Sequence, residues 1–491
     1  MTSVAPEGQT LAPTTPEELE RTLGSAHSAA GPFGRLLASE KARILDAIAD
    51  ALEADAEGLV AVAAAETNLG PDRLNGELKR TAFQLRLFGD VLREGSFLDV
   101  RIDHEDPHWP SGAARPDTRR TKLPIGPVLV FSASNFPFAF SVAGGDTASA
   151  LAAGNPVVVK AHSGHPQLSE RTARVVTHAC RSAGAPEGVF ALIRGTEAGS
   201  EALKDHRIKA AGFTGSIPGG RALMDIAMSR PEPIPFYGEL GSNNPVFVTP
   251  AAAEARGDAI AKGYVASFTL GAGQFCVKPG MLFIPAGTGM LEKLRASALP
   301  DGAKMLNERI QKGYVESLQK LSSHPNVKVL VQGLSPLSTT PSPTLLITKA
   351  EHVLAAPREL EAECFGPTSV VVEYDDISEL VPLAETFEGQ LTATIHGEDD
   401  CPVQDLVRVL SEKAGRVLWN QWPTGVAVTY AQHHGGPYPA STATATTSVG
   451  TAAIDRFLRP VAYQGFPQHL LPAELREENP LGVPQLINGR R

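Results

Sequence analysis

The chain has 491 residues, which is too long for one ordinary domain, so two or three domains are expected. Its 42% hydrophobic and 20% charged residues are typical of a soluble protein with a sizeable core. A formal net charge of −10 argues against nucleic acid or an anionic membrane as the main partner. No apolar run reaches the roughly 18 residues of a membrane span, and the polar, acidic N-terminus is unlike a signal peptide. These features predict a cytoplasmic protein.

The N-terminal part of the chain is expected to be helical after a loose arm. Residues 1 to about 22 are rich in Pro, Thr and Glu, which favours an irregular arm. Apolar residues recur at helical spacing from about 35 to 65, and 71–97 has the same pattern. A polar excursion, EDPHWPSGAARPDTRRT, follows at 105–121.

A strand and helix alternation follows this excursion. Short apolar runs rich in β-branched residues and bounded by Gly or Pro occupy 125–131, 156–161, 189–193 and 209–213. Helical stretches lie between them at about 142–153, 168–183 and 197–205. This order predicts parallel βαβ units in a doubly wound α/β sheet, with a ligand beyond the carboxyl ends of the strands.

A second α/β block is expected at 241–435. Its strand candidates are NPVFVTP, MLFIP, TSVVVEY, TATIHG and RVLWN. The Ser/Pro-rich stretch 335–344 is expected to be a surface loop inside this block. The Pro-rich residues 436–491 are not expected to fold alone, so they should pack on the body of the protein or on a partner subunit.

Three segments carry side chains that suit covalent catalysis. GAGQFC at 271–276 places one of the four cysteines after two glycines, where the backbone can bend sharply and expose the sulfur. ELGSNNP at 239–245 offers a carboxylate beside a flexible turn, and SASNFPF at 132–138 offers an amide that could face an oxyanion. Each segment alone is better explained as a turn, a surface acid or a strand cap. The other cysteines, none of them in a CxxC pair, indicate neither a redox motif nor a zinc site.

Together these segments resemble one enzyme family. SNFPF, VVVKAHS, FTGSIPGG, ELGSNNP, GQFC and ECFGP occur in the order seen in the aldehyde dehydrogenase family, over about residues 30 to 470. The GELGSNNP, LGAGQFC and HGGPYPA segments are similar to those of bacterial enzymes that oxidise α-ketoglutaric semialdehyde. The resemblance implies oxidation of a small acidic or hydroxylated semialdehyde to the carboxylate with NAD(P).

The resemblance assigns catalytic roles to three residues. Cys276 matches the nucleophile that attacks the aldehyde carbon and then carries a thioester. Asn135 matches the side-chain donor to the oxyanion, with the backbone N–H of Cys276 as its companion. Glu239 matches the general base that activates water for thioester hydrolysis, a role that a pKa raised by partial burial would suit.

The segment FTGSIPGG at 213–220 is the candidate phosphate turn. It follows a strand and opens a helix, where Ser216 suits the N-cap and Pro218 the first turn. It is not a GxGxxG fingerprint, but amides at a helix N-terminus favour a pyrophosphate. The resemblance identifies Gly215, Ser216 and Gly220 as the residues of this turn that bind the cofactor.

The resemblance also assigns contacts with the riboses of the cofactor. Lys160 matches the residue at the adenosine ribose, while Glu363 and Phe365 match the pair that holds the nicotinamide ribose and ring. Many relatives carry a glutamate three residues after this lysine, where this chain has Ser163. A carboxylate would repel the extra phosphate of NADP, whereas a serine could donate to it, with Arg194 as a second contact. NADP is therefore predicted to be accepted at least as well as NAD; alternatively, Ser163 is only a loop residue and selectivity is weak.

His433 and His434, before GGPYP, raise the question of a metal ion. Adjacent side chains diverge, and no further ligand cluster is evident in the sequence. A loop role and no metal site are therefore expected.

The expected architecture is an aldehyde dehydrogenase-like α/β fold in five segments. They are the N-terminal arm and helices (1–104), an oligomerisation excursion (105–124), the dinucleotide-binding domain (125–240), the catalytic domain (241–435) and a C-terminal oligomerisation tail (436–491). The resemblance implies a homodimer or homotetramer. Two alternatives stay open. A CoA-acylating enzyme is disfavoured by Glu239, and a catalytically silent binding protein is disfavoured by the retained site residues.

Overall fold

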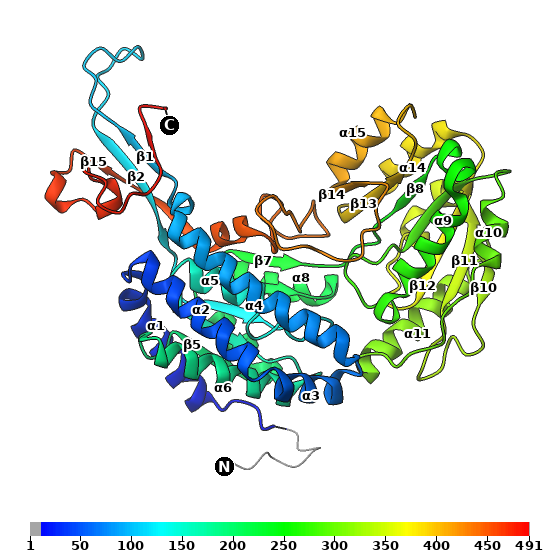
Figure 1. Ribbon diagram of the computed structural model, residues 1–491, viewed down its shortest axis with the longest axis horizontal. Helices are drawn as coiled ribbons and strands as arrows, with labels where there is room; N and C mark the ends of the chain where they lie inside the picture. Colours follow the sequence, from blue (N-terminus) through cyan, green and yellow to red (C-terminus); the bar gives the residue numbers. More distant parts are fainter. Residues whose placement is uncertain (1–10, 491) are drawn as a thin grey trace.

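The computed structural model describes residues 11–490, which form two α/β lobes and a projecting β arm (Figure 1). One lobe is built on a five-stranded sheet, the other on a seven-stranded sheet, and the arm on a four-stranded sheet. Within the described residues, no helix is both long and apolar enough to cross a membrane.

The first lobe is organised around a parallel sheet with the strand order β5-β4-β3-β6-β7. Its strands are β3 (Val128–Phe131), β4 (Val157–Lys160), β5 (Phe190–Ile193), β6 (Ala210–Thr214) and β7 (Phe236–Glu239). The helices between them are α5 (Gly145–Ala152), α6 (Pro166–Ser182), α7 (Thr196–Lys204) and α8 (Ile217–Met228). The predicted doubly wound parallel sheet is thus confirmed, with β7 as an additional strand.

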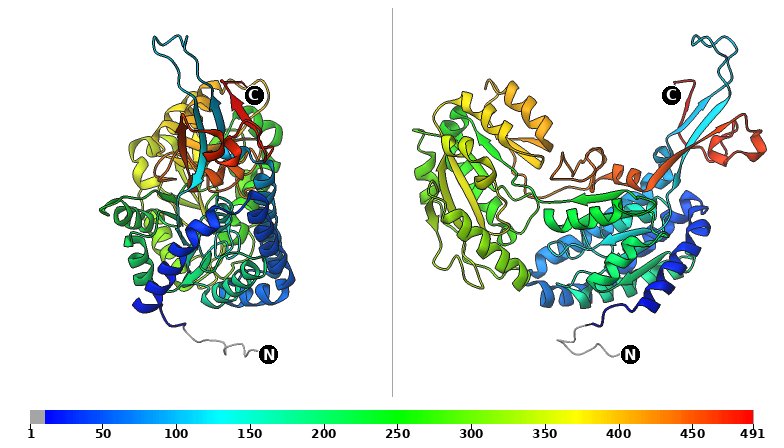
Figure 2. Two further views of the ribbon diagram at one scale, coloured as in Figure 1. Left: turned by 90° about the vertical axis from the view of Figure 1, so that its left-hand side faces the viewer. Right: turned by 180° about the vertical axis from the view of Figure 1, so that it is seen from behind.

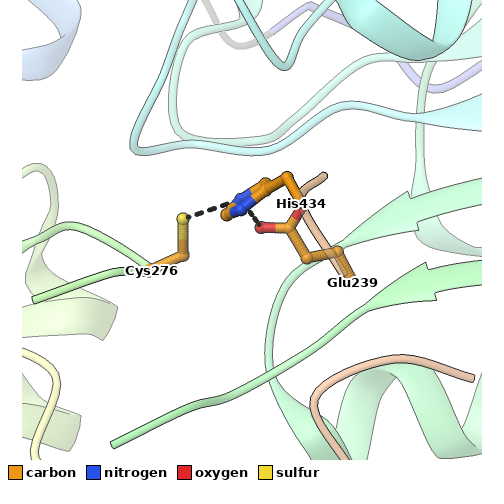
Figure 3. Close-up of side chains that lie close together, drawn as sticks. All are labelled: Glu239, Cys276 and His434. Carbon is orange, nitrogen blue, oxygen red and sulfur yellow. Dashed lines mark hydrogen bonds and ion pairs between the residues drawn. The ribbon is translucent and has the colours of Figure 1, made fainter. Parts of the chain in front are cut away.

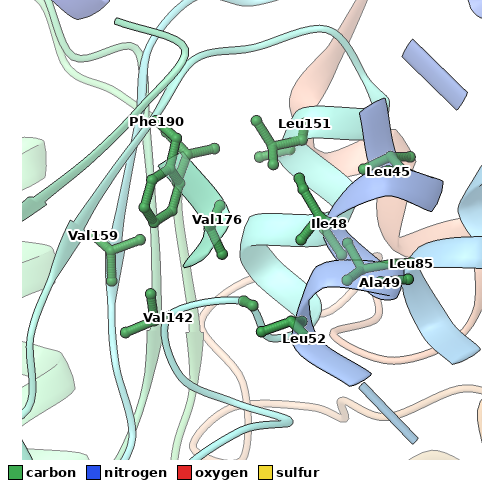
Figure 4. Close-up of a cluster of buried hydrophobic side chains, with 14 of the residues drawn as sticks. Leu45, Ile48, Ala49, Leu52, Leu85, Val142, Leu151, Val159, Val176 and Phe190 are labelled. Atoms are coloured by element: carbon green, nitrogen blue, oxygen red, sulfur yellow. The ribbon is translucent and has the colours of Figure 1, made fainter. Parts of the chain in front are cut away.

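Four helices precede this sheet: α1 (Pro16–Gly34), α2 (Ala38–Ala54), α3 (Ala56–Thr67) and α4 (Pro71–Glu94). Figure 4 shows the core that they share with the sheet lobe, including Leu45, Ile48, Leu85, Leu151, Val176 and Phe190. The predicted loose arm is wrong for residues 16–22, because Thr15 and Glu18 form a capping box that starts α1. Residues 1–10 of that arm lie outside the described part of the chain.

The second lobe contains a sheet with the order β10-β11-β12-β9-β8-β13-β14, in which β10 is antiparallel to its neighbour and the other pairings are parallel. Its strands are β8 (Val246–Val248), β9 (Met281–Pro285), β10 (Lys328–Gln332), β11 (Thr344–Lys349), β12 (Thr368–Tyr374), β13 (Gln390–His396) and β14 (Ala414–Trp419). Its helices are α9 (Pro250–Thr269), η2 (Leu270–Gly273), α10 (Met290–Ala296), α11 (Glu308–Ser322), α12 (Ala350–Ala355), α13 (Pro357–Leu360), α14 (Leu380–Thr386) and α15 (Gln404–Lys413). Buried apolar clusters cover the two faces of this sheet.

The arm joins the polar excursion to the C-terminal tail. Its strands are β1 (Val100–Asp103), β2 (Thr118–Pro124), β15 (Leu458–Gln464) and β16 (Gln485–Ile487), in the order β15-β2-β1-β16. The tail enters the arm from η4 (Thr451–Phe457), and β15 pairs with β2 along its whole length. Figure 2 shows the arm extending away from both lobes. One edge of β15 is left without a neighbouring strand in the described chain.

Candidate active site

The candidate site lies where the carboxyl edge of the first sheet meets the second lobe. The first lobe supplies Asn135 after β3, Lys160 at the end of β4, Ser216 after β6 and Glu239 at the end of β7. Because these strands are parallel, their ends bring the side chains to one edge of the sheet. The second lobe supplies Cys276, which follows η2 and reaches the same edge.

A left-handed turn sets the path of the backbone to Cys276. Three successive residues have positive φ, namely Gly271 (58°), Ala272 (55°) and Gly273 (67°). A Cβ atom on Gly273 would lie 2.1 Å from the carbonyl oxygen of Gly366, so only glycine fits there. The glycines of GAGQFC therefore place the cysteine.

Asn244 connects two of the sequence motifs. Its buried side chain donates from Nδ2 to the carbonyl oxygens of Cys276 at 2.8 Å and Lys278 at 2.9 Å. Its Oδ1 accepts from the hydroxyls of Ser242 and Thr392. ELGSNNP thus holds the cysteine segment in addition to supplying a carboxylate, a role that the motif alone does not indicate.

Asn135 lies beside the cysteine segment, where an oxyanion donor has to be. Its Nδ2 donates to the carbonyl oxygen of Gln274 at 3.3 Å, and its side chain is buried. A carboxamide has two N–H donors, so one is left for an oxyanion. The loop that carries Asn135 is held by α4, because Oε1 of Glu77 accepts from the backbone amides of Phe138 and Ala139.

His434 lies on an irregular segment, as expected, but its side chain occupies the centre of the site, a position that the sequence did not predict. Its side chain is 0% exposed, and Nε2 lies 3.5 Å from Sγ of Cys276 and 2.9 Å from Oε1 of Glu239. Figure 3 shows that both side chains are directed at this one ring nitrogen. The three side chains offer donor atoms within 4.8 Å of one another, although Cys276 and His434 are 158 positions apart in the chain.

The thiol and the carboxylate of the site have pKa values shifted in opposite directions. Burial, together with the adjacent charge of Glu239, raises the pKa of the Cys276 thiol well above its ordinary value. Burial also pushes the pKa of Glu239 upward, but His434 and hydrogen bonds outweigh it and hold that pKa below its ordinary value. The raised pKa expected for Glu239 is therefore wrong, because its partners stabilise the carboxylate.

The C-terminal return completes the surroundings of Glu239. Ser448 donates from Oγ to Oε2 of Glu239 at 2.6 Å, and its backbone N–H donates to the carbonyl oxygen of His434 at 2.8 Å. The backbone N–H of Leu240 donates to the carbonyl oxygen of Ala440 at 2.8 Å. Residues 434–448 therefore form a third wall of the site.

The Gly-rich turn after β6 opens helix α8. Ser216 is its N-cap, and Oγ accepts from the backbone N–H of Gly219 at 3.3 Å. A Cβ atom on Gly220 would lie 2.1 Å from Cδ2 of Leu240, so this glycine allows α8 to approach the end of β7. Gly215 and Ser216 are exposed, and the helix N-terminus that they lead into is suited to a pyrophosphate.

Two cations lie near the end of β4. Lys160 is half-buried, and burial together with the nearby Arg309 lowers its pKa. Ser163 is exposed on the following loop. Arg194 is not free for the phosphate contact expected of it, because its Nη1 pairs with Glu170 at 2.9 Å and its Nε donates to the N-terminal segment. The second cation beside Lys160 is therefore Arg309.

Glu363 lies against the loop that follows Glu239. A Cβ atom on Gly241 would be 2.4 Å from Oε2 of Glu363, so this loop passes directly beside the carboxyl group. Burial raises the pKa of Glu363 to about 7, although the buried ammonium of Lys278 opposes the shift. Phe365 is half-buried on the same segment.

Four residues described above were not predicted as members of the site: Asn244, Arg309, His434 and Ser448. The HGGPYPA segment contains His434, so its place in the resemblance was the available signal. The run of Ser and Thr at 441–448 carries no comparable signal, because such residues are common in surface loops.

Fold and site define a class of protein: a two-lobed α/β enzyme that presents a cysteine thiol and a carboxylate at the sheet edge where a Gly-rich turn opens a helix. The chain belongs to the aldehyde dehydrogenase family, which matches residues 7–460. It is 43% identical to α-ketoglutaric semialdehyde dehydrogenase of Acinetobacter baylyi, over 99% of this chain and 94% of that protein. It is 45% identical to α-ketoglutaric semialdehyde dehydrogenase 2 of Azospirillum brasilense, over 96% and 91%.

Solved structures share the fold. The chain is similar to 3,6-anhydro-L-galactose dehydrogenase, with a TM-score of 0.77 and 21% identity over 92% of each chain. It is also similar to 1-pyrroline-5-carboxylate dehydrogenase from Thermus with bound NAD, with a TM-score of 0.76 and 20% identity over 91% of this chain and 85% of that one. Family and fold together make the protein an NAD(P)-dependent aldehyde dehydrogenase, which oxidises an aldehyde to the carboxylate.

Proposed function

We propose that this enzyme oxidises α-ketoglutaric semialdehyde, or a similar small acidic semialdehyde, through a thioester on Cys276, and that it accepts NADP at least as well as NAD. The names of the two relatives above support this substrate class. Coverage of more than nine-tenths of each relative supports a comparison of whole enzymes.

Two half-buried arginines near Cys276 are the observation on which the proposed acidic substrate rests. The guanidinium groups of Arg80 and Arg416 both interact electrostatically with Cys276. Nη1 of Arg80 and Nε of Arg416 are buried and meet no acceptor among residues 11–490. An unpaired buried donor is costly, and a substrate carboxylate would supply the missing acceptor by a charge-assisted hydrogen bond.

The residues of the site support a complete oxidation cycle. Sγ of Cys276 attacks the aldehyde carbon, and the free N–H of Asn135 stabilises the oxyanion. A bound nicotinamide ring supplies the acceptor for the hydride that leaves this carbon. Glu239, held as a carboxylate, then activates water for hydrolysis of the thioester. A base so close to the sulfur favours hydrolysis over transfer to coenzyme A.

Charge near Lys160 supports the use of NADP. Ser163 stands where a carboxylate would repel the ribose phosphate, and Arg309 adds a second positive charge. Glu363 and Phe365 would hold the nicotinamide half, and the turn at Ser216 the pyrophosphate. Ser163→Glu is expected to lower kcat/KM with NADP relative to NAD; an unchanged ratio would mean that Ser163 does not select the cofactor.

Exposed apolar residues on the arm support assembly of the chain into a homodimer or homotetramer. Phe466, Leu470, Leu481 and Ile487 are exposed. The unpaired edge of β15 lies on the same arm. Exposed edges and apolar side chains are typical of surfaces that pair with another chain.

Initial rates with α-ketoglutaric semialdehyde and with pentanal, a neutral aldehyde, test the proposed substrate class. Arg80→Gln is expected to raise KM for the acidic substrate by about tenfold or more, since a charge-assisted hydrogen bond contributes about 1.5–3 kcal/mol. KM for pentanal should change little, and Arg43→Gln on the exposed side of α2 should change neither. Equal effects on both substrates would contradict carboxylate recognition by Arg80. Cys276→Ala should abolish both oxidations and leave cofactor binding intact.

A further inference from the structure

The proposed cycle gives no role to His434, although its ring lies between the nucleophile and the carboxylate. We propose that His434 is a catalytic residue that accepts the proton of the Cys276 thiol while the sulfur attacks the aldehyde. This inference rests on the proposed function only in taking Cys276 as the nucleophile.

The geometry of the imidazole directs one nitrogen at the sulfur. Nε2 and Sγ form a hydrogen bond of 3.5 Å, which is an ordinary length for a contact with sulfur. Oε1 of Glu239 is closer, at 2.9 Å, but its geometry relative to the ring is not that of a hydrogen bond, and the contact becomes an ion pair only once the ring is protonated. The direction of Nε2 therefore faces Sγ, while the carboxylate lies beside the ring. This arrangement suits a base whose protonated form is stabilised by a neighbouring negative charge.

The surroundings explain why Cys276 needs a proton acceptor of its own. Burial and the charge of Glu239 both raise the pKa of the thiol, so an isolated thiolate is disfavoured at neutral pH. A proton that passes to Nε2 leaves an imidazolium in contact with both the thiolate and the carboxylate. The negative charge that opposes a lone thiolate then stabilises the cation next to it.

Other charged groups face the pair from several elements. Those that interact with Cys276 or His434 are Glu239 of β7, Arg80 of α4, Arg416 of β14, Glu363 and the adjacent His433. Of these, Glu239 contacts Nε2 and lies within 4.8 Å of Sγ. Its carboxylate is therefore the alternative acceptor for the thiol proton. The backbone of His434 is tied by Thr447 at 2.8 Å and by Ser448 at 2.8 Å, which keeps the ring in place.

The step balances in protons and electrons. The Sγ–H bond breaks and an Nε2–H bond forms, while the sulfur electron pair makes the bond to the aldehyde carbon. The carbonyl oxygen takes the negative charge and is stabilised by Asn135. Departure of the hydride to the cofactor restores the carbonyl group as a thioester. The imidazolium then loses its proton to water, which accounts for the proton released when an aldehyde is oxidised.

Alkylation of Cys276 by iodoacetamide, quantified by peptide mass spectrometry over a range of pH, tests the inference without turnover. His434→Gln is expected to slow alkylation near pH 7 by about tenfold or more and to move the rise in rate to higher pH, because the thiol loses its base. His206→Gln, which changes a histidine whose side chain is 83% exposed, is the control and should keep the wild-type profile. His434→Phe, which retains an aromatic ring beside Phe140, should reproduce the slow rate if His434→Gln fails to fold.

The possible results separate the two acceptors and the two proposals. A wild-type profile in folded His434→Gln and His434→Phe, as judged by thermal unfolding and cofactor binding, would overturn the inference. The inference would also be overturned if Glu239→Gln lost alkylation while both His434 variants kept it, because Glu239 would then be the proton acceptor. Full oxidation activity in Cys276→Ser would instead refute the proposed nucleophile.

Discussion

Glu363 is an acid of the site whose pKa, about 7, lies in the physiological range. Under the proposed role it accepts hydrogen bonds from the nicotinamide ribose, which its ionised form does best. Because burial raises its pKa, the carboxylate is present above pH 7 and is lost as the pH falls below it. Cofactor affinity should therefore increase with pH through this range.

We predict that NADP binds Cys276→Ala enzyme about tenfold more weakly at pH 6 than at pH 8, as expected from the ionised fraction of an acid with a pKa near 7. Fluorescence titration measures this difference, and Glu363→Gln should remove it. Glu361 is the matched control, because burial also raises its pKa to about 7 while its side chain bonds to Thr386. A flat wild-type profile, or one abolished by Glu361→Gln, would rule out the role of Glu363.

At the scale of elements, the turn η2 of the second lobe determines where the backbone places Cys276. Gly273→Ala should lower the free energy of unfolding by about 1–3 kcal/mol, since it adds a strained φ and a clash with the Gly366 carbonyl. It should also lower kcat, because the clash displaces the segment that carries Cys276. Thermal unfolding and steady-state rates measure the two effects.

Ala272→Gly provides the control for this turn. Ala272 already has a positive φ of 55°, a conformation that costs a non-glycine residue roughly 1–2 kcal/mol. The substitution should leave stability equal or higher. If Ala272→Gly lost as much stability as Gly273→Ala, the loss could not be attributed to the clash with the Gly366 carbonyl.

Most elements with a strong local pattern were predicted from the sequence, although the largely buried strand β11 was not. The apolar runs that became β3, β4, β5 and β6 are bounded by Gly or Pro and buried. In contrast, β7 contains a glycine, and β10 is an edge strand with largely exposed side chains, so neither shows a clear apolar period. Helix α1 was not predicted, because its capping box lies in a Pro/Thr/Glu-rich stretch that favours an arm, and the first expected helix began only at about residue 35.

The residues of the site that lie in recognisable motifs were predicted from the sequence. Properties that depend on contacts with distant segments were not. Asn135, Glu239 and Cys276 come together as the resemblance implied. The pKa of Glu239 could not be foreseen, because His434 and Ser448 lie roughly two hundred positions further along the chain. The position of Arg194 depends in the same way on Glu170 and on the N-terminal segment.

At the scale of the molecule, the arm makes assembly testable. Phe466→Glu with Leu470→Glu should shift the enzyme toward smaller species in sedimentation velocity, because the charges oppose burial of these side chains against a second copy. Leu334→Glu is the control, since Leu334 is fully exposed on the loop between β10 and β11 in the second lobe, away from the sheet of the arm. An unchanged size in the double variant would remove the arm residues from the interface.

The wall formed by residues 434–448 also bears on how the enzyme is made. Glu239 and Cys276 are synthesised well before His434 and Ser448, and β7 can pair with Ser441 and Thr442 only after those residues have been made. A nascent or truncated chain therefore carries its thiol and its carboxylate without the groups that organise them. Fragments that end before residue 434 should therefore be inert toward aldehydes, because they lack groups that contact the thiol and the carboxylate.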